Sequence, residues 1–196
     1  QTDVTSGIQN VLNQNIKTDV VVIQKYIERP LLIQGRKFDM RLWVLVTHEH
    51  KAYLFKEGYI RMSSQKYSLQ RTQQEDLFIH LTNNAVQKNM ENYGRYEEGN
   101  ILAFSHLQAY LDAQQGPADY VRESLLPQIK NQVALSLEAV RSKLAIDRGC
   151  FELFGYDIMI DDDLQFARRS AAGDFHPGGV GVADAVPQQR LRYAEE

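Results

Sequence analysis

Apolar and polar residues alternate over residues 37–49, which predicts a long β-strand whose two faces differ. One face would carry the apolar side chains of Phe38, Met40, Leu42 and Val44. The other would carry Lys37, Asp39, Arg41 and Trp43. A β-branched run over residues 20–27 predicts a buried strand before it, and residues 51–55 and 59–63 predict two strands after it. We therefore expect the first half of the chain to form a sheet with one apolar and one charged face.

Helical periodicity follows in the second half of the chain. Residues 101–113 predict one helix, with Asn100 in position to cap its N-terminus. Residues 121–144 predict a longer helix, in which Pro127 either introduces a kink or starts the regular part. Residues 151–160 return to a strand pattern. Strands, helices and a final strand indicate an α+β or mixed α/β fold.

The composition is that of an ordinary globular protein, with 43% hydrophobic and 24% charged residues among 196. A net charge of −3 argues against a protein that coats nucleic acid by bulk charge. No apolar run is long enough to span a membrane. The single cysteine, Cys150, excludes an internal disulfide and a zinc site built from several cysteines, and it favours a reducing compartment.

Charged residues at strand positions are the main candidates for a binding site. Lys37, Asp39 and Arg41 would share one strand face, where two cations and a carboxylate suit a nucleotide. A row of ion pairs on a solvated sheet face is the alternative, and the pattern by itself favours it. Arg61 could share this face with Arg41, and two converging arginines need an anion such as phosphate between them. An exposed arginine at a sheet edge is the alternative for Arg61.

Two further features carry candidate polar groups. Asp157 lies in an otherwise apolar strand and needs a partner, either a magnesium ion that bridges phosphates or a cation from a neighbouring strand. The segment 80–83, His-Leu-Thr-Asn, can cap a helix, orient a ribose or hold a loop. The polar segment 90–100 contains two glycines and predicts an exposed loop.

Five ordered blocks of the chain resemble the tubulin–tyrosine ligase family, namely QKYIERPLLIQGRKFDMRLWVLVT, YLFKEGYIRMSS, HLTNNAVQK, NYGRYEEGN and FELFGYDIMIDDDL. The resemblance runs from about residue 20 to residue 164. It implies an ATP-grasp fold and an ATP- and Mg2+-dependent ligase. Such an enzyme activates a carboxylate as an acyl phosphate and joins it to the amine of an amino acid.

The resemblance also implies a substrate and a place in the cell. The block NYGRYEEGN is most similar to the tyrosine-adding branch of the family, so we expect tyrosine to be joined to the acidic C-terminal tail of α-tubulin. One alternative is a polyglutamylase, which joins glutamate to side-chain carboxylates of tubulin tails. Another is an inactive fragment that only binds tubulin or nucleotide. We expect a cytoplasmic protein associated with microtubules, with no nucleic-acid or membrane partner.

Residue roles follow from the same resemblance. The nucleotide-binding residues it implies are Gln24, Lys25, Tyr26, Ile27, Lys37, Asp39, Thr82 and Asn83. The first four would line the adenine pocket, and Thr82 and Asn83 would lie near the nucleotide and the acceptor. Arg41 and Arg61 would stabilise charge on the transferring phosphoryl group. Asp157 would bind magnesium.

The chain departs from the family pattern at both ends. The family's upstream lobe, with its phosphate-covering loop and lysine, has no counterpart in this sequence. The strand that supplies further magnesium ligands in the family does not follow Leu164. We therefore expect residues 1–19 to be a linker from a missing lobe, residues 20–165 to be an incomplete ATP-grasp domain, and residues 166–196 to be a disordered or non-homologous tail.

Overall fold

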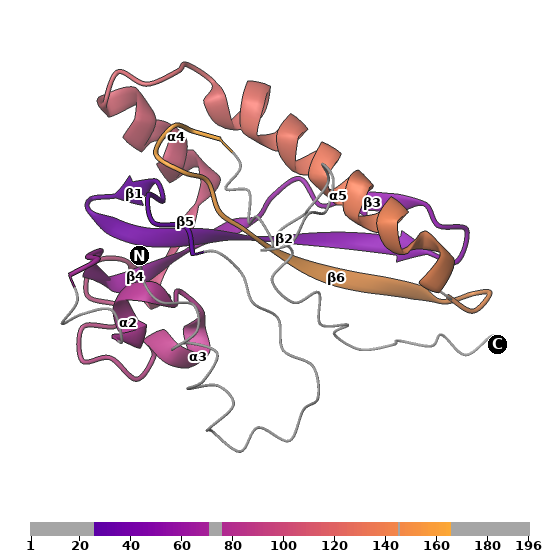
Figure 1. The fold of residues 1–196 in the computed structure, drawn as a ribbon, viewed down its shortest axis with the longest axis horizontal. Helices are drawn as coiled ribbons and strands as arrows, with labels where there is room; N and C mark the ends of the chain where they lie inside the picture. Colours follow the sequence, from indigo (N-terminus) through magenta and orange to yellow (C-terminus); the bar gives the residue numbers. More distant parts are fainter. Residues whose placement is uncertain (1–25, 71–75, 145, 166–196) are drawn as a thin grey trace, which may run out of the picture.

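The computed structural model describes residues 26–70, 76–144 and 146–165 (Figure 1). In this part of the chain, six strands form one sheet in which every pair is antiparallel. The strands are β1 (Leu32–Ile33), β2 (Arg36–Thr47), β3 (Ala52–Leu54), β4 (Tyr59–Lys66), β5 (Ile101–Ala103) and β6 (Phe151–Ile158). The fold is therefore α+β. The strand expected over residues 20–27 falls almost wholly outside the described residues, and so do the linker and tail expected at the two ends.

The strand β2 is the centre of the sheet, because it pairs with β1, β3, β4 and β6. Its N-terminal half lies beside β4, and its C-terminal half lies between β3 and β6. The long alternating strand predicted from the sequence is confirmed, and its register fixes which side chains from β4 and β6 share a face with it.

Helices cover the two faces of the sheet unequally (Figure 1). On one face lie α4 (Phe104–Ala113) and α5 (Leu126–Val140), and α5 is flanked by a π-helical turn, η3 (Val121–Leu125), and a 3-10 turn, η4 (Arg141–Lys143). The short helices α2 (Leu77–His80) and α3 (Asn84–Gln87) lie on the other face, next to β4. None of the helices in the described residues is both long and apolar enough to cross a bilayer.

The core lies between the sheet and the helices α4 and α5. Phe38, Met40, Leu42 and Val44 are each at most 2% exposed, as the alternation predicts. They belong to one buried cluster with residues of α4 and α5 such as Leu107 and Ile129. The apolar face of β2 therefore faces the helical layer, and its charged face is turned to the side that α2 and α3 cover only in part.

One detail differs from the sequence prediction, and the structure decides between two alternatives for a second. Asn100 does not cap a helix, because Ile101–Ala103 forms β5 and α4 begins at Phe104. Pairing of Ile101 with Arg61 of β4 determines the local structure there, and helical periodicity does not. Pro127 lies in the first turn of α5, directly after the π-helical turn η3, so it stands where the regular part of the helix starts.

Candidate functional site

A row of four ion-paired side chains crosses the charged face of the sheet. The guanidinium of Arg61 donates to both carboxylate oxygens of Asp39, with 2.7 Å between Nε and Oδ1. Its Nη2 atom also lies 2.9 Å from Oδ2 of Asp157. Oδ1 of Asp157 accepts from Nε of Arg41 at 2.6 Å. The charges therefore alternate from Asp39 through Arg61 and Asp157 to Arg41.

Strand register explains why these four residues meet. In the antiparallel pairs, Asp39 lies opposite Arg61 and Arg41 lies opposite Asp157. The described residues therefore form the row of ion pairs that the sequence analysis gave as the alternative to a nucleotide site. Asp157 is the anion that lies between the two arginines. Arg61 is not an exposed edge residue, since it is only 8% exposed.

Burial differs along the row. Asp39 and Arg61 are largely enclosed, whereas the side chains of Arg41 and Asp157 keep 17% and 24% of their surface exposed. Burial lowers the pKa of Arg61, but the hydrogen bond to Asp39 and the charges of both carboxylates raise it by more. Arg61 therefore stays protonated. The exposed end of the row, at Arg41 and Asp157, is the part that a ligand can reach.

A glycine on β6 makes room for Arg41. Gly155 lies opposite Trp43, and the guanidinium of Arg41 lies 5.5 Å from the centre of the Trp43 ring. A Cβ atom at position 155 would be 2.6 Å from Nη1 of Arg41. The position of Arg41 therefore depends on the absence of a side chain at Gly155.

Lys37 lies in a separate polar cluster at the end of α2. Its Nζ donates to the carbonyl of His80 at 2.7 Å and to the hydroxyl of Tyr26 at 3.1 Å. The Tyr26 hydroxyl also contacts Nδ1 of His80 at 2.8 Å. Burial, together with the neighbouring Tyr67 hydroxyl, raises the pKa of Tyr26. Tyr26, Lys37 and His80 thus form one cluster on this face of the sheet.

The other expected nucleotide-binding residues differ in their burial and in their contacts. Ile27 precedes the sheet, and its carbonyl oxygen lies 3.4 Å from the Tyr67 hydroxyl. Thr82 is 6% exposed and shares a cavity with Arg61, whereas Asn83 is exposed at the N-cap of α3 and makes no capping bond through its side chain. Gln24 and Lys25 lie outside the described residues.

Two buried side-chain amides near the site, those of Gln87 and Asn100, belong to no periodic sequence pattern that would predict their burial. Gln87 is fully buried, accepts from the Ser64 amide of β4 at 2.8 Å, and donates to the carbonyls of Phe78 and Leu81. It therefore ties the segment that carries Thr82 to the sheet. Its only signal in the sequence is its place in the block HLTNNAVQK.

Asn100 has a similar structural role. Its amide nitrogen donates to the Met62 carbonyl and the Ser64 hydroxyl of β4, and its oxygen accepts from the Gly94 amide. The segment 90–100 predicted as an exposed loop is therefore fastened to the sheet at its end. Arg36 and Glu97 fasten it a second time through a buried pair with bonds of 2.7 and 2.8 Å.

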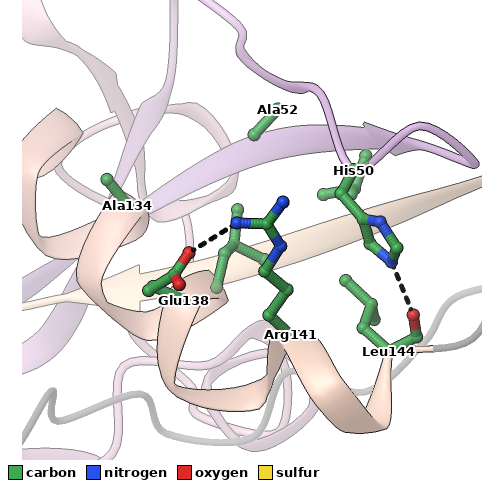
Figure 2. A pocket seen from close by; sticks show the side chains of 8 residues that line it. His50, Ala52, Ala134, Glu138, Arg141 and Leu144 are labelled. Carbon is green, nitrogen blue, oxygen red and sulfur yellow. Dashed lines mark hydrogen bonds and ion pairs between the residues drawn. The ribbon is translucent and has the colours of Figure 1, made fainter.

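Two cavities are of interest. One, of about 70 Å³, lies beside Arg61 and Thr82. The other, of about 230 Å³, lies between the end of α5 and the strands β2 and β3. Figure 2 shows Arg141 of this second cavity between Glu138, its ion-pair partner, and His50, whose Nε2 contacts the Leu144 carbonyl. Val46, which also lines the second cavity, belongs to the apolar face of β2, so this cavity is separate from the ion-pair row.

Carboxylates that could hold a metal ion occur at two places in the described residues. Asp161, Asp162 and Asp163 lie together in a turn, but Oδ1 of Asp161 accepts two backbone amides and the other two carboxylates pair with Arg29. Asp157 is the better candidate, because magnesium sites commonly use one or two carboxylates together with substrate phosphates. A metal at Asp157 requires Arg41 or Arg61 to exchange this carboxylate for another anion.

Comparisons with known proteins identify the family. A probable alpha-tubulin polyglutamylase of Tetrahymena thermophila is 35% identical over 149 residues, which is 75% of this chain and 35% of that protein. Probable tubulin polyglutamylases of Bos taurus and Mus musculus are each 38% identical, over 76% and 74% of this chain and 32% and 31% of their own length. The chain thus spans about a third of the length of these relatives. The model of the Tubulin-tyrosine ligase family matches residues 2–167, and the chain belongs to this family.

Proposed function

We propose that this chain supplies part of the active site of an ATP-dependent ligase that joins glutamate to carboxylate groups of tubulin. Family membership and the names of the relatives support a tubulin-modifying ligase. The observation that carries the proposal is the pairing of two arginines with one partly exposed carboxylate, Asp157, on a sheet face that helices cover only in part. Proximity and charge neutralisation are the main demands of phosphoryl transfer.

The ion-pair row suits an exchange of anions. Arg41 and Arg61 each carry a fork of N–H groups that matches phosphate as well as carboxylate. In the proposed site, Arg41 and Arg61 would hold phosphate oxygens in place of Asp157, and Asp157 would hold the magnesium. Asp39 keeps its bonds to Arg61, so the arginine stays in place during the exchange. When bound, the nucleotide would supply the phosphoryl group that activates the carboxylate, and magnesium would neutralise charge on the phosphates.

The remaining candidate residues would complete the proposed nucleotide site. With this site, we propose that the fold is of the ATP-grasp type. Tyr26 and Ile27 would contact the adenine, and Lys37 and Asp39 would lie near the ribose and phosphates. Thr82 and Asn83 would lie near the nucleotide and the acceptor. The cluster of Tyr26, Lys37 and His80 supports this placement, because it already gathers polar groups on the same face of the sheet.

The amino acid proposed here is glutamate. The expectation of tyrosine rested on the block NYGRYEEGN, and the relatives, which are named as polyglutamylases, do not support it. Glu97 of this block binds Arg36, Tyr96 stacks on the same guanidinium at 4.6 Å, and Asn100 binds β4. Because these residues anchor the loop to the sheet, the block is a weak guide to the amino acid that is transferred. A polyglutamylase would act in the cytoplasm at microtubules.

Calorimetric titration of the 196-residue protein with Mg·ATP tests the nucleotide site. We expect saturable binding that Asp157→Asn weakens about tenfold or more, because the substitution removes the carboxylate that would hold the metal. Asp119→Asn, which removes an exposed carboxylate beside Arg122, is the matched control and should bind as the wild type does. Absence of binding, or equal binding by Asp157→Asn, would refute the nucleotide site.

The transferred amino acid is tested in a ligation assay with tubulin, ATP and labelled glutamate or tyrosine. Incorporation of glutamate with no incorporation of tyrosine is expected. Incorporation of tyrosine alone would contradict the proposal and support a ligase that transfers tyrosine. Nucleotide binding without incorporation of either would favour a nucleotide-binding fragment.

A further inference from the structure

The side-chain amide of Gln87 joins three backbone groups in the interior of the protein. Its nitrogen donates to the carbonyls of Phe78, at 3.0 Å, and Leu81, and its oxygen accepts from the amide of Ser64 at 2.8 Å. Gln87 is 0% exposed, so both N–H groups and the oxygen of its side chain are satisfied within the protein. Because a buried polar group that loses its partner costs free energy, this amide fixes the end of α2 relative to β4.

Lys37 binds the same end of α2 from another strand. The last carbonyls of a helix lack partners inside it, and three carbonyls at the C-terminal end of α2 accept from side chains instead. Gln87 binds those of Phe78 and Leu81, and Nζ of Lys37 binds that of His80 at 2.7 Å. The end of α2 is therefore held between β2, which carries Lys37, and α3, which carries Gln87.

This arrangement makes the positions of Lys37 and Thr82 depend on each other. Lys37 is 5% exposed and donates to the His80 carbonyl, and Thr82, which is 6% exposed, directly follows Leu81. A shift of residues 78–82 would move the acceptor of Lys37 and the backbone of Thr82 at the same time. Gln87 is a buried contact that opposes such a shift.

We propose that Gln87 is a positioning residue of the nucleotide site, which sets the places of Lys37 and Thr82 together through the carbonyls at the end of α2. The inference rests on the proposed function, in which these two residues lie near the nucleotide. Since Gln87 is fully buried, it acts through Lys37 and Thr82 and does not touch the nucleotide itself. A purely structural amide would change the stability of the protein but would leave the pH profile of nucleotide affinity unchanged.

Gln87→Glu is the variant that tests this role. The introduced carboxyl group is buried and faces two carbonyl oxygens, so its pKa is raised from the ordinary value for glutamate. In its protonated form it donates to one carbonyl and accepts from the Ser64 amide, whereas in its ionised form it offers acceptors only and repels both carbonyls. The variant should therefore resemble the wild type at low pH and lose the arrangement as the pH rises.

Two further variants and the wild type complete the comparison. Gln87→Met has a similar size and removes the three hydrogen bonds at every pH, and Gln114→Glu makes the same chemical change at an exposed position after α4. The elements packed against α3 carry their own titratable groups, namely His80 of α2, Tyr59, Arg61 and Lys66 of β4, and Glu98 of the 3-10 turn η2 (Glu98–Asn100). These groups and the nucleotide titrate in the wild type too, so the wild type at each pH is the reference.

Calorimetric titration of the 196-residue protein with Mg·ATP at about pH 5 and about pH 8.5 measures the effect on the site. We expect Gln87→Glu to bind within about twofold of the wild type at the lower pH and about tenfold more weakly at the higher pH. Gln87→Met should bind about tenfold more weakly at both, and Gln114→Glu should follow the wild type. Wild-type affinity of both Gln87 variants, or a weakening by Gln87→Glu that does not depend on pH, would overturn the proposal.

Nuclear magnetic resonance of the nitrogen-15-labelled protein without nucleotide separates this proposal from the nucleotide site. In Gln87→Glu, the amide signals of Lys37, His80 and Thr82 should match those of the wild type at the lower pH and move away from them as the pH rises. Movement confined to the amide of Ser64, which contacts the introduced group, would overturn the proposal even if Mg·ATP binds. The expected movement in a protein that does not bind Mg·ATP would refute the nucleotide site alone, and Gln87 would remain the residue that positions Lys37 and Thr82.

Discussion

Arg61 and Asp39 form a bidentate ion pair across β2 and β4, and both residues are less than one-tenth exposed. Arg61 therefore has a structural role as well as the ligand-binding role inferred from the sequence. Replacement of Arg61 by alanine therefore affects the fold as well as the proposed site, because it leaves a buried carboxylate without its partner.

Arg61→Ala is expected to lower the free energy of unfolding by about 3–5 kcal/mol, since one partner of a buried ion pair is removed. Urea denaturation followed by circular dichroism measures the change. Arg122→Ala, which removes an arginine whose side chain is 73% exposed, is the control and should change stability by less than about 0.5 kcal/mol. Equal stability of the two variants would show that the Asp39 pair contributes little.

Gly155→Ala should disturb the nucleotide site without changing any charge. The new Cβ would lie 2.6 Å from Nη1 of Arg41, so the guanidinium has to move away from Asp157. We expect affinity for Mg·ATP to fall about tenfold, with a stability cost of about 1–3 kcal/mol from the crowding. Gly149→Ala is the control, because no atom lies within 4 Å of its added Cβ and only its φ of +80° is unfavourable. It should lower stability and leave affinity unchanged.

Asn100→Gly separates the hydrogen bonds of Asn100 from its backbone conformation. Its φ is 55°, a left-handed value that glycine adopts freely, so the substitution introduces no backbone strain. Loss of the bonds to Met62, Ser64 and Gly94 should lower the free energy of unfolding by about 2 kcal/mol. Hydrogen exchange should quicken in residues 90–100. Gln115→Gly, at an exposed residue with a φ of 56°, is the control and should be neutral or stabilising by up to about 1 kcal/mol.

Stability should fall at high pH because of Tyr120. Burial raises the pKa of Tyr120 from its ordinary value of 10.0 to about 12, so between these values the unfolded chain loses a proton that the folded chain keeps. The contribution is complete below pH 10 and is lost as the pH rises toward 12. One such group gives a slope of about 1.4 kcal/mol per pH unit. Tyr120→Phe should flatten the fall in unfolding free energy, and an unchanged slope would exclude this residue as its cause.

The sequence predicts the central strand well because alternation is a local signal. The positions of Phe38 and Met40 in the core, and of Asp39 and Arg41 on the charged face, follow from a period of two residues along β2. The helix α5 and the position of Pro127 at its start are equally local. These parts could be predicted without knowledge of the rest of the chain.

The remaining parts depend on contacts between distant residues. Asp157 pairs with Arg41, which is 116 positions away in the sequence. The sequence therefore indicates that Asp157 needs a partner, but it does not identify that partner. The strand β5 forms because β4 lies beside it, although its residues also fit a helical pattern. Gln87 and Asn100 became recognisable only once the backbone groups they satisfy had been located.

The central position of β2 has a consequence for the order in which this protein can be made. Arg41 and Arg61 leave the ribosome long before Asp157, and the two arginines acquire their shared carboxylate only when β6 is added to the sheet. During synthesis the edge of β2 that will receive β6 is open, which makes this edge a natural place for a chaperone to bind. A pause in translation before residue 151 would thus leave a polypeptide with paired strands β2 and β4 but with an unbalanced positive charge where the site will form.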